Sequence, residues 1–435
     1  MNSYHSGVRS GWQIKSIWLY VSALLFLGVI GMGGTALAEG DNADGFWDAV
    51  TGGKPSLDMR ARIEIADADP SGPAKLDQSE AYTLRTRLGY GTKPWHGGLL
   101  FAEAENVTAV ATSQYFSLTE PPTGQTPIAD PTVTEVNQAY LKIQRDDLVD
   151  YAFIGGRQRI KLDDDRFVGN VGWRQNEQTY DALLGASSLG VEDLSVAYGF
   201  VRYVRRIFGE SRSSLLPVRD LTTNAHVIHA SYGGLDPVKI AGFIYLLDVR
   251  DIAALSSASY GFRVTGSTEV MDDLDLIYEG SYAYQTDYAD QPVDYETHYV
   301  MAQLKAAQSD LGTIGVGWEM LGSDNGAAQF VTPLATAHKF NGWADVFLGN
   351  GGPAGLRDFF VSVAPKLPYK FSGVFVYHNF RSDDKDKLLG NEYDLLLKRP
   401  INDHLTLLTK AAIFESERDE LADIWRIWLQ AEVKF

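Results

Sequence analysis

Short segments in which apolar and charged residues alternate recur along the chain after residue 38. Residues 55–66 show the pattern clearly, with apolar side chains on one parity and charged side chains on the other: Leu57, Met59, Ala61, Ile63 and Ile65 against Asp58, Arg60, Arg62 and Glu64. A helix would not place charges at every second position, because its period is 3.6 residues. Alternating segments of about ten residues are typical of a transmembrane β-barrel.

The predicted fold is all-β, a transmembrane antiparallel barrel of about eighteen strands, with sixteen as the alternative count. The strands are predicted at 55–66, 81–91, 97–106, 133–144, 151–159, 178–186, 194–204, 224–233, 238–248, 259–269, 273–286, 296–307, 311–321, 356–366, 369–380, 391–399, 404–415 and 423–435. The connections alternate between long and short, which indicates long extracellular loops and short periplasmic turns. Closure is expected because lipid cannot satisfy the hydrogen bonds of an open sheet edge.

The first residues predict export. Arg9 and Lys15 precede an apolar stretch at 17–31, and Ala36 and Ala38 fit a small-residue cleavage site. We therefore predict a signal peptide at 1–38, a short periplasmic lead-in at 39–54 and the barrel at 55–435, in the outer membrane of a Gram-negative cell. The alternative is a membrane anchor, but the apolar stretch is shorter than the roughly 20 residues of a spanning helix.

Composition excludes several classes of function. The chain has no cysteine and a formal net charge of −18, so thiol chemistry and nucleic-acid binding are not expected. Gly185–Leu189 misses the nucleophile elbow because its fifth residue is not glycine. Asp163, Asp164 and Asp165 lack the alternate spacing of an EF-hand loop and are interpreted as a solvated loop or lumen salt bridges. We predict no enzyme activity, catalytic residue, cofactor or metal site.

The predicted inward faces carry nearly equal numbers of basic and acidic side chains, but the basic ones cluster. Arg60 and Arg62 should neighbour Arg85 and Arg87 on the next strand. Such a cluster has two interpretations. Arginine rings in a pore favour anions, or these arginines pair with Glu64, Glu103 and Glu105 and fill the wall.

Two motifs carry a family resemblance. Residues 156–181 run from Gly156 through Arg166-Phe167-Val168-Gly169-Asn170 to Asp181, and a later motif spans His338–Asp345 and Gly355–Asp358. They resemble the alginate export family of outer-membrane channels. The resemblance implies a monomeric 18-stranded barrel whose basic lumen conducts a polyanionic polysaccharide by facilitated diffusion.

The loop at 160–177 is expected to fold into the barrel, because Phe167, Val168 and Trp173 would be poorly placed in solvent. A constriction is then predicted along the solute path, with these candidates: Arg157, Arg159, Arg166, Arg174, Arg60, Arg62, Arg85 and Arg87. The final strand, ending at Phe435, resembles the signal read by the outer-membrane assembly machinery. Lipids of the outer membrane and an anionic saccharide are the other expected partners.

These observations predict an outer-membrane channel for anionic solutes, either an acidic polysaccharide or its oligo- and monosaccharides. A general or adhesion-type barrel is the first alternative, since the long 107–132 and 322–355 loops could form external binding surfaces. A barrel hydrolase is the second alternative. An energised importer is disfavoured because residues 39–54 are too few to form a plug domain.

Overall fold

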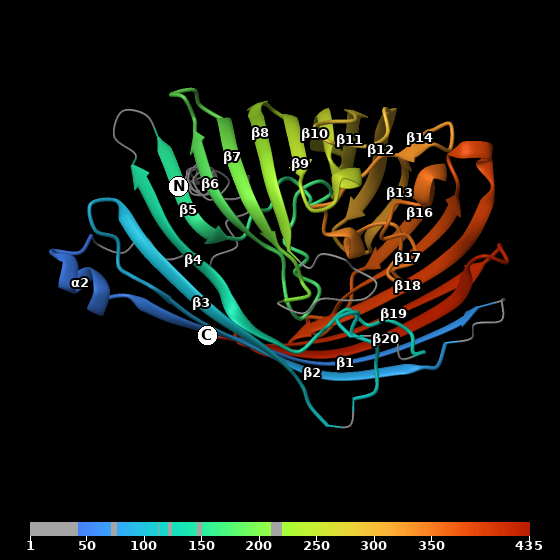
Figure 1. The fold of residues 1–435 in the computed structure, drawn as a ribbon, viewed down its shortest axis with the longest axis horizontal. Helices are drawn as coiled ribbons and strands as arrows, with labels where there is room; N and C mark the ends of the chain where they lie inside the picture. The colour runs from blue at the N-terminus through green and yellow to red at the C-terminus, as the bar shows by residue number, and fades with distance from the viewer. Residues whose placement is uncertain (1–41, 71–75, 112, 121–123, 146–149, 210–219) are drawn as a thin grey trace, which may run out of the picture.

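The computed structural model describes residues 42–70, 76–111, 113–120, 124–145, 150–209 and 220–435. Within these ranges the chain forms one antiparallel sheet of eighteen strands, in which the first strand pairs with both the second and the last (Figure 1). The sheet is therefore closed, and both the predicted fold class and the predicted strand count are confirmed. The predicted signal peptide lies outside the described residues.

The barrel strands follow one another in chain order. They are β1 (Lys54–Pro70), β2 (Ser79–Gly91), β3 (Gly98–Ala109), β4 (Val133–Arg145), β5 (Tyr151–Gln158), β6 (Thr179–Ser187), β7 (Leu194–Arg205), β8 (Leu221–Leu235), β9 (Val238–Val249), β10 (Ser257–Met271), β11 (Leu274–Thr286), β12 (Glu296–Gln308), β13 (Gly312–Leu321), β16 (Leu356–Pro365), β17 (Ser372–Arg381), β18 (Leu388–Pro400), β19 (Leu405–Ser416) and β20 (Ala422–Lys434). Each predicted strand overlaps one of these, and the ends differ by only a few residues.

The remaining elements are short. They are α2 (Phe46–Thr51), β14 (Ser323–Asp324), β15 (Ala328–Gln329) and the 3₁₀ turns η1 (Ala253–Leu255), η2 (Ala337–Lys339), η3 (Gly352–Ala354) and η4 (Asp384–Asp386). No described helix has the length and apolar character needed to cross a membrane.

The predicted lead-in contains α2, a short helix that was not predicted from the sequence. The helix docks beside the short connection between β2 and β3, where the Lys93 N–H donates to the Ala49 carbonyl at 2.9 Å. The Tyr90 hydroxyl donates to the Val50 carbonyl at 2.5 Å and fastens the helix to the outer face of β2. In Figure 1 the helix lies at one end of the barrel, on the side of the short turns.

The outer face of the barrel is apolar. Large aliphatic side chains such as Leu88, Leu183, Leu395 and Leu429 are 47–61% exposed on it. Soluble proteins rarely expose so much continuous apolar surface, whereas a barrel in lipid must. The fold and this surface place the chain in the outer membrane.

The chain closes on itself through its last residue. The Leu57 N–H donates to the Phe435 carbonyl at 3.1 Å, and the Phe435 N–H donates to the Leu57 carbonyl at 2.9 Å. The Phe435 ring stacks on His404 with 4.5 Å between centroids. The terminal aromatic residue therefore continues the ladder between β1 and β20.

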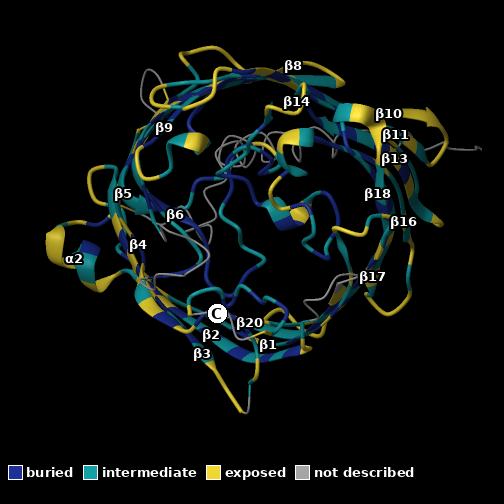
Figure 2. Cartoon of the chain, turned by 45° about the vertical axis from the view of Figure 1, so that its right-hand side comes forward, coloured by how far each residue is buried: buried dark blue, intermediate teal, exposed yellow. Residues whose placement is uncertain are grey.

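Three long connections turn back onto the inner face of the barrel, in the described residues 115–120 and 124–132, 159–178 and 322–355 (Figure 2). An apolar core forms where the last two segments pack on the inner faces of the strands, with Val168, Phe330 and Leu334 almost fully buried. The predicted inward fold of 160–177 is confirmed, because Val168 is buried and Trp173 packs on the barrel interior. The 322–355 segment also folds inward rather than forming an external surface.

Candidate lumen constriction

Segments 159–178 and 322–355 contact each other inside the barrel. Val168 and Leu334 form a parallel bridge, and the Gly169 N–H donates to the Leu334 carbonyl at 2.9 Å. The third segment joins them through Asp130, whose carboxylate accepts the Gln175 N–H at 2.9 Å and pairs with Arg62 at 3.3 Å. The three segments therefore form one layer attached to the barrel wall.

Glu64 on β1 is the point where the three segments meet the wall. Its carboxylate pairs with Arg174 at 3.0 Å and with Arg426 at 3.2 Å, and its side chain is fully buried. The Arg426 guanidinium also donates to the carbonyls of Ala344 at 2.9 Å and Pro127 at 3.0 Å. A buried carboxylate needs such partners, because burial of an unpaired charge is costly. We call six residues the loop junction: Glu64, Arg174, Arg426, Asp345, His338 and Lys410.

The other half of the loop junction surrounds Lys410 on β19. Its ammonium lies 4.1 Å from the ring centroid of Trp173, 3.8 Å from that of Trp343 and 5.4 Å from that of Trp428. Cation–π attraction of this kind is strongest when the cation is desolvated. Trp173 comes from segment 159–178, Trp343 from segment 322–355 and Trp428 from β20 of the wall, so the cage fastens these two segments to the barrel.

His338 connects the two halves of the loop junction. Its Nδ1 lies 2.6 Å from an oxygen of Asp345, and its Nε2 lies 2.7 Å from Lys410 Nζ. Burial, with a contribution from Lys410 and Arg174 against the attraction of Asp345, lowers the pKa of His338 to about 3. Burial would raise the pKa of Asp345, but His338 and Arg174 hold it well below its ordinary value. The imidazole is therefore neutral, with Nδ1–H donating to Asp345 and Nε2 accepting from Lys410.

The four predicted arginines of β1 and β2 lie together on the inner wall. Arg60 is paired in register with Arg85, and Arg87 is paired with Asp58. The side chain of Arg85 is fully buried, and it is held by Asp58 at 2.5 Å and Glu432 at 3.3 Å. Like charges so close together require interleaved carboxylates, and the wall supplies them.

Each of the other three arginines of this cluster also has a carboxylate partner. Arg60 pairs with Glu432 at 2.9 Å, and Arg62 pairs with Asp130. Arg87 pairs with Glu105 and lies 3.4 Å from Glu177. Arg60 also donates to the carbonyls of residues 172–174, so the cluster holds the inward segment as well as the wall.

Arg159, Arg166 and Arg174 lie on the inward segment itself. Arg159 pairs with Glu103 at 2.7 Å and with Glu177 at 2.5 Å, and Arg166 pairs with Glu319 at 2.9 Å. Although burial raises the pKa of Glu177, the arginines 159 and 87 lower it to about 2. Arg174 belongs to the loop junction. These three side chains bridge the segment to β3, β13 and β1.

Arg157 requires a correction, because it lies on the outer face of the barrel rather than in the lumen. It is paired in register with Ala139, which is exposed on the outer face, and with Asp181. Its neighbours Ile154 and Gln158 are buried on the inner face. The prediction gave Arg157 and Arg159 the same inward face within a strand at 151–159, but β5 ends at Gln158 and Arg159 no longer obeys the alternation of the strand.

The seven inward arginines are thus paired with wall or segment carboxylates and largely buried. The second interpretation from the sequence, in which they pair and fill the wall, describes their geometry. Their pairing partners include all three that the sequence suggested: Glu64, Glu103 and Glu105.

More accessible cations lie elsewhere, and none of them is among the predicted constriction residues. Lys339 is 49% exposed and Lys161 is 37% exposed in their side chains, and Lys305 is partly exposed on the inner face of β12. Arg263, on the inner face of β10, is 14% exposed and pairs with Asp164 at 3.1 Å and Glu279 at 2.7 Å. We call these four residues the accessible cations. Strand parity places Arg263 and Lys305 on inner faces, but nothing in the sequence distinguishes exposed from buried positions within the lumen.

The aspartates of the inward segment lie beside the accessible cations. Asp164 lies 3.1 Å from Arg263, and Asp165 lies 3.4 Å from Lys161. Asp163 lies 3.0 Å from Nε2 of His229. The interpretation as lumen salt bridges therefore holds for Asp164 and Asp165. Among the described residues, no group of three or more His, Asp or Glu side chains is arranged to hold a metal ion.

No family model matches the chain, and no curated protein matches it either. Solved structures do. OccAB4 of Acinetobacter baumannii is 12% identical with a TM-score of 0.67, over 88% of this chain and 98% of that one. OpdK of Pseudomonas aeruginosa, solved with vanillate, is 14% identical with a TM-score of 0.66 over the same shares. OccK9 (OpdG) of the same organism is 14% identical with a TM-score of 0.66, over 89% and 100%.

At these identities the similarity shows the fold, which is that of an outer-membrane porin. The porin-like barrel that the family resemblance implies is supported by these structures. Nothing in the comparisons points to the alginate export family in particular.

Proposed function

We propose that this protein is a passive outer-membrane channel for small anionic solutes, with sugar acids and their short oligomers as the favoured class. The observation that carries the proposal is a closed barrel with a layer of inward segments beside which accessible cations remain. Lys161 and Lys339, the most exposed of these cations, lie on the inward segments themselves, and such cations attract carboxylates in a pore.

Small solutes are favoured over a polymer because the inward segments are firmly attached. A long polysaccharide needs a wide continuous path, whereas the loop junction fixes two segments to β1, β19 and β20 through buried contacts. The presence of vanillate, a carboxylate, in the OpdK structure agrees with a small anion. Passage of an intact acidic polysaccharide is the larger-solute alternative that the same experiment tests.

The proposal is tested by single-channel recording in a planar bilayer under a salt gradient. We expect an open pore whose reversal potential shows anion preference, and whose current is blocked by mono- and oligouronates but not by the corresponding neutral sugars. A cation-selective pore would contradict the anionic solute. A barrel that folds but conducts no current would contradict the channel and favour the adhesion-type alternative.

The length dependence of block distinguishes small solutes from polymers. We expect block by uronates of one to a few residues, with weaker entry as the chain lengthens. Entry and translocation of a long polyuronate with the same efficiency would instead support the polysaccharide channel.

A further inference from the structure

A charged network lies on the outer face of the barrel, at the extracellular ends of β5–β7. Arg157 donates through Nε to Asp181 at 2.7 Å and through Nη1 to the Val136 carbonyl at 2.8 Å. Arg205 donates to the same Asp181 at 2.8 Å and to Asp220 at 2.7 Å. The side chains of Arg157 and Arg205 remain 23% and 28% exposed.

A β-bulge adds to this network. The register between β7 and β8 shifts between Val201 and Tyr203, so Arg202 is left without a partner position in the ladder. Tyr203 is paired in register with Asp181 and therefore shares the outer face with it. The guanidinium carbons of Arg202 and Arg205 both lie 5.3 Å from the Tyr203 ring centroid. Bulges commonly re-aim a side chain in this way.

The network has more cations than anions. It contains Arg157, Arg202 and Arg205 against Asp181 and Asp220, around one amphipathic tyrosine. A charged side chain on the lipid face of a barrel strongly destabilises the fold near the middle of the bilayer but has little effect on stability near the interface. The network therefore belongs at the level of lipid headgroups.

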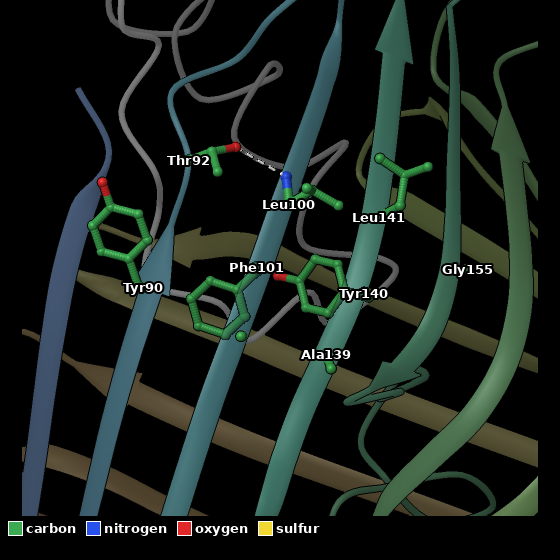
Figure 3. Close-up of a pocket in the computed structure, with 9 residues that line it drawn as sticks. Tyr90, Thr92, Leu100, Phe101, Ala139, Tyr140, Leu141 and Gly155 are labelled. Atoms are coloured by element: carbon green, nitrogen blue, oxygen red, sulfur yellow. Dashed lines mark hydrogen bonds between the residues drawn. The ribbon is translucent and has the colours of Figure 1, made fainter. Parts of the chain in front are cut away.

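An apolar depression on the outer face includes Ala139, the residue that is paired in register with Arg157. Its volume is about 450 Å³, and its lining includes the small residues Ala102, Ala139 and Gly155. Tyr90, Leu100 and Leu141 also line it (Figure 3). Tyr90, Ala102, Ala139 and Arg157 are successive partners in one row across β2–β5. The row continues from Arg157 to Asp181 and Tyr203, so the depression leads directly to the charged network.

We propose that this outer face binds a phosphorylated, acylated glycolipid of the outer leaflet. One acyl chain lies over Ala102, Ala139 and Gly155, and a headgroup phosphate accepts from the guanidinium groups of Arg157 and Arg205. Guanidinium groups match phosphate oxygens in geometry and charge, and small residues let a chain approach the sheet. The site is independent of conduction through the lumen.

The position of the network selects the outer leaflet. β5 has only 8 residues, which at about 3.3 Å per residue and a tilt of roughly 40° makes a wall of about 20 Å above the short turns. The apolar band of such barrels is about 25 Å tall. Arg157, the seventh of these residues, therefore lies in the outer half of the apolar band, and Arg205 at the end of the longer β7 lies nearer the headgroups of the outer leaflet.

Native mass spectrometry of the full-length mature barrel in detergent tests the proposal, with three probes: bis-phosphorylated lipid A, the same lipid without phosphates, and phosphatidylglycerol. We expect the wild type to retain lipid A best. The double variant Arg157→Ala/Arg205→Ala should retain lipid A roughly tenfold less, which is the effect of losing charge-assisted hydrogen bonds. Ala139→Leu, which fills the depression, should weaken both lipid A forms.

Matched controls come from the same outer surface. Arg399→Ala removes an outer-face cation at the periplasmic end of β18, and Ala302→Leu fills a second depression of about 290 Å³, whose lining includes no arginine or lysine. Both should leave lipid A retention unchanged. The variant Arg157→Lys/Arg205→Lys keeps the charges, and heat-modifiable migration shows that each variant is folded.

Unchanged lipid A retention in the folded alanine double variant would overturn the proposal, and so would an equal loss in Arg399→Ala. Equal retention of phosphatidylglycerol with the same arginine dependence would reject the glycolipid in favour of any phosphorylated lipid. Equal retention of lipid A without phosphates would reject the headgroup contact.

Discussion

Lys410 Nζ lies 2.7 Å from His338 Nε2, inside a cage of three tryptophan rings. This contact joins β19 of the barrel wall to the inward segment 322–355. Since His338 also contacts Asp345, and Asp345 contacts Arg174, one continuous chain of contacts links β19 to segments 322–355 and 159–178. The position of the segments in the lumen thus depends on a few buried side chains.

The variant Lys410→Met should loosen the inward segments. Methionine keeps the apolar volume of the side chain but loses the cation–π attraction and the hydrogen bond to His338, which together stabilise the folded state by roughly 1–3 kcal/mol. We expect larger and noisier single-channel currents and a lower urea midpoint. Lys398→Met, at an exposed position of the neighbouring strand, is the control and should leave both unchanged. Identical currents in Lys410→Met would show that the cage does not fix the segments.

Removal of Arg174 should be more damaging than removal of Lys410. Arg174→Ala leaves Glu64 and Asp345 with one partner fewer in a buried environment, and breaking such a pair costs roughly 3–5 kcal/mol. We expect a large loss of stability in urea unfolding. The double variant Arg174→Ala/Glu64→Gln should recover part of the loss, because glutamine removes the unpaired charge. Additive losses in the two single variants would argue against their direct coupling.

Acidification should destabilise the loop junction. The pKa of His338 is lowered to about 3 in the folded protein and returns to about 6.5 on unfolding, so the unfolded state binds the proton first. The associated stability is fully present above pH 6.5 and is lost as the pH falls toward 3. Asp345, with its lowered pKa, adds a loss in the same direction at lower pH.

The pH effect of His338 is measured by comparison with His338→Gln. Between pH 7 and pH 5 the wild type should lose roughly 2 kcal/mol more than the variant, at 1.36 kcal/mol per pKa unit below 6.5. Urea unfolding at several pH values provides the numbers. Parallel pH profiles of the two proteins would show that His338 is not the titrating group.

The strand pattern could be predicted from sequence because the lipid outside and the polar interior impose a strict period of two. The same rule explains the correct neighbourhood of Arg60 and Arg85. It failed at Arg157, where the strand ends and the chain turns inward one residue later. Alternation assigns a side chain to one face only within a strand that is hydrogen-bonded to its neighbours.

The loop junction could not be derived from periodicity. Glu64 and Arg426 are 362 residues apart and meet because β1 pairs with β20, which closure predicts. The approach of Arg174 and Asp345 to them depends on how two irregular segments pack, and irregular backbone carries no comparable periodic signal. The second motif, residues 338–345, did mark the segment that supplies His338, Trp343 and Asp345.

Anion preference should depend on the accessible cations and not on Arg157. Replacing Lys161 and Lys339 by glutamine removes two exposed charges from the lumen and should shift the reversal potential toward cation preference. Arg157→Ala should leave the potential unchanged, because its side chain lies on the outer face beside Asp181. Each variant keeps the strand ladder intact, so a change in selectivity cannot be assigned to misfolding when heat-modifiable migration is normal. A change of selectivity in Arg157→Ala but not in the lysine double variant would exclude Lys161 and Lys339 from the solute path. It would also contradict the placement of the Arg157 side chain on the outer face.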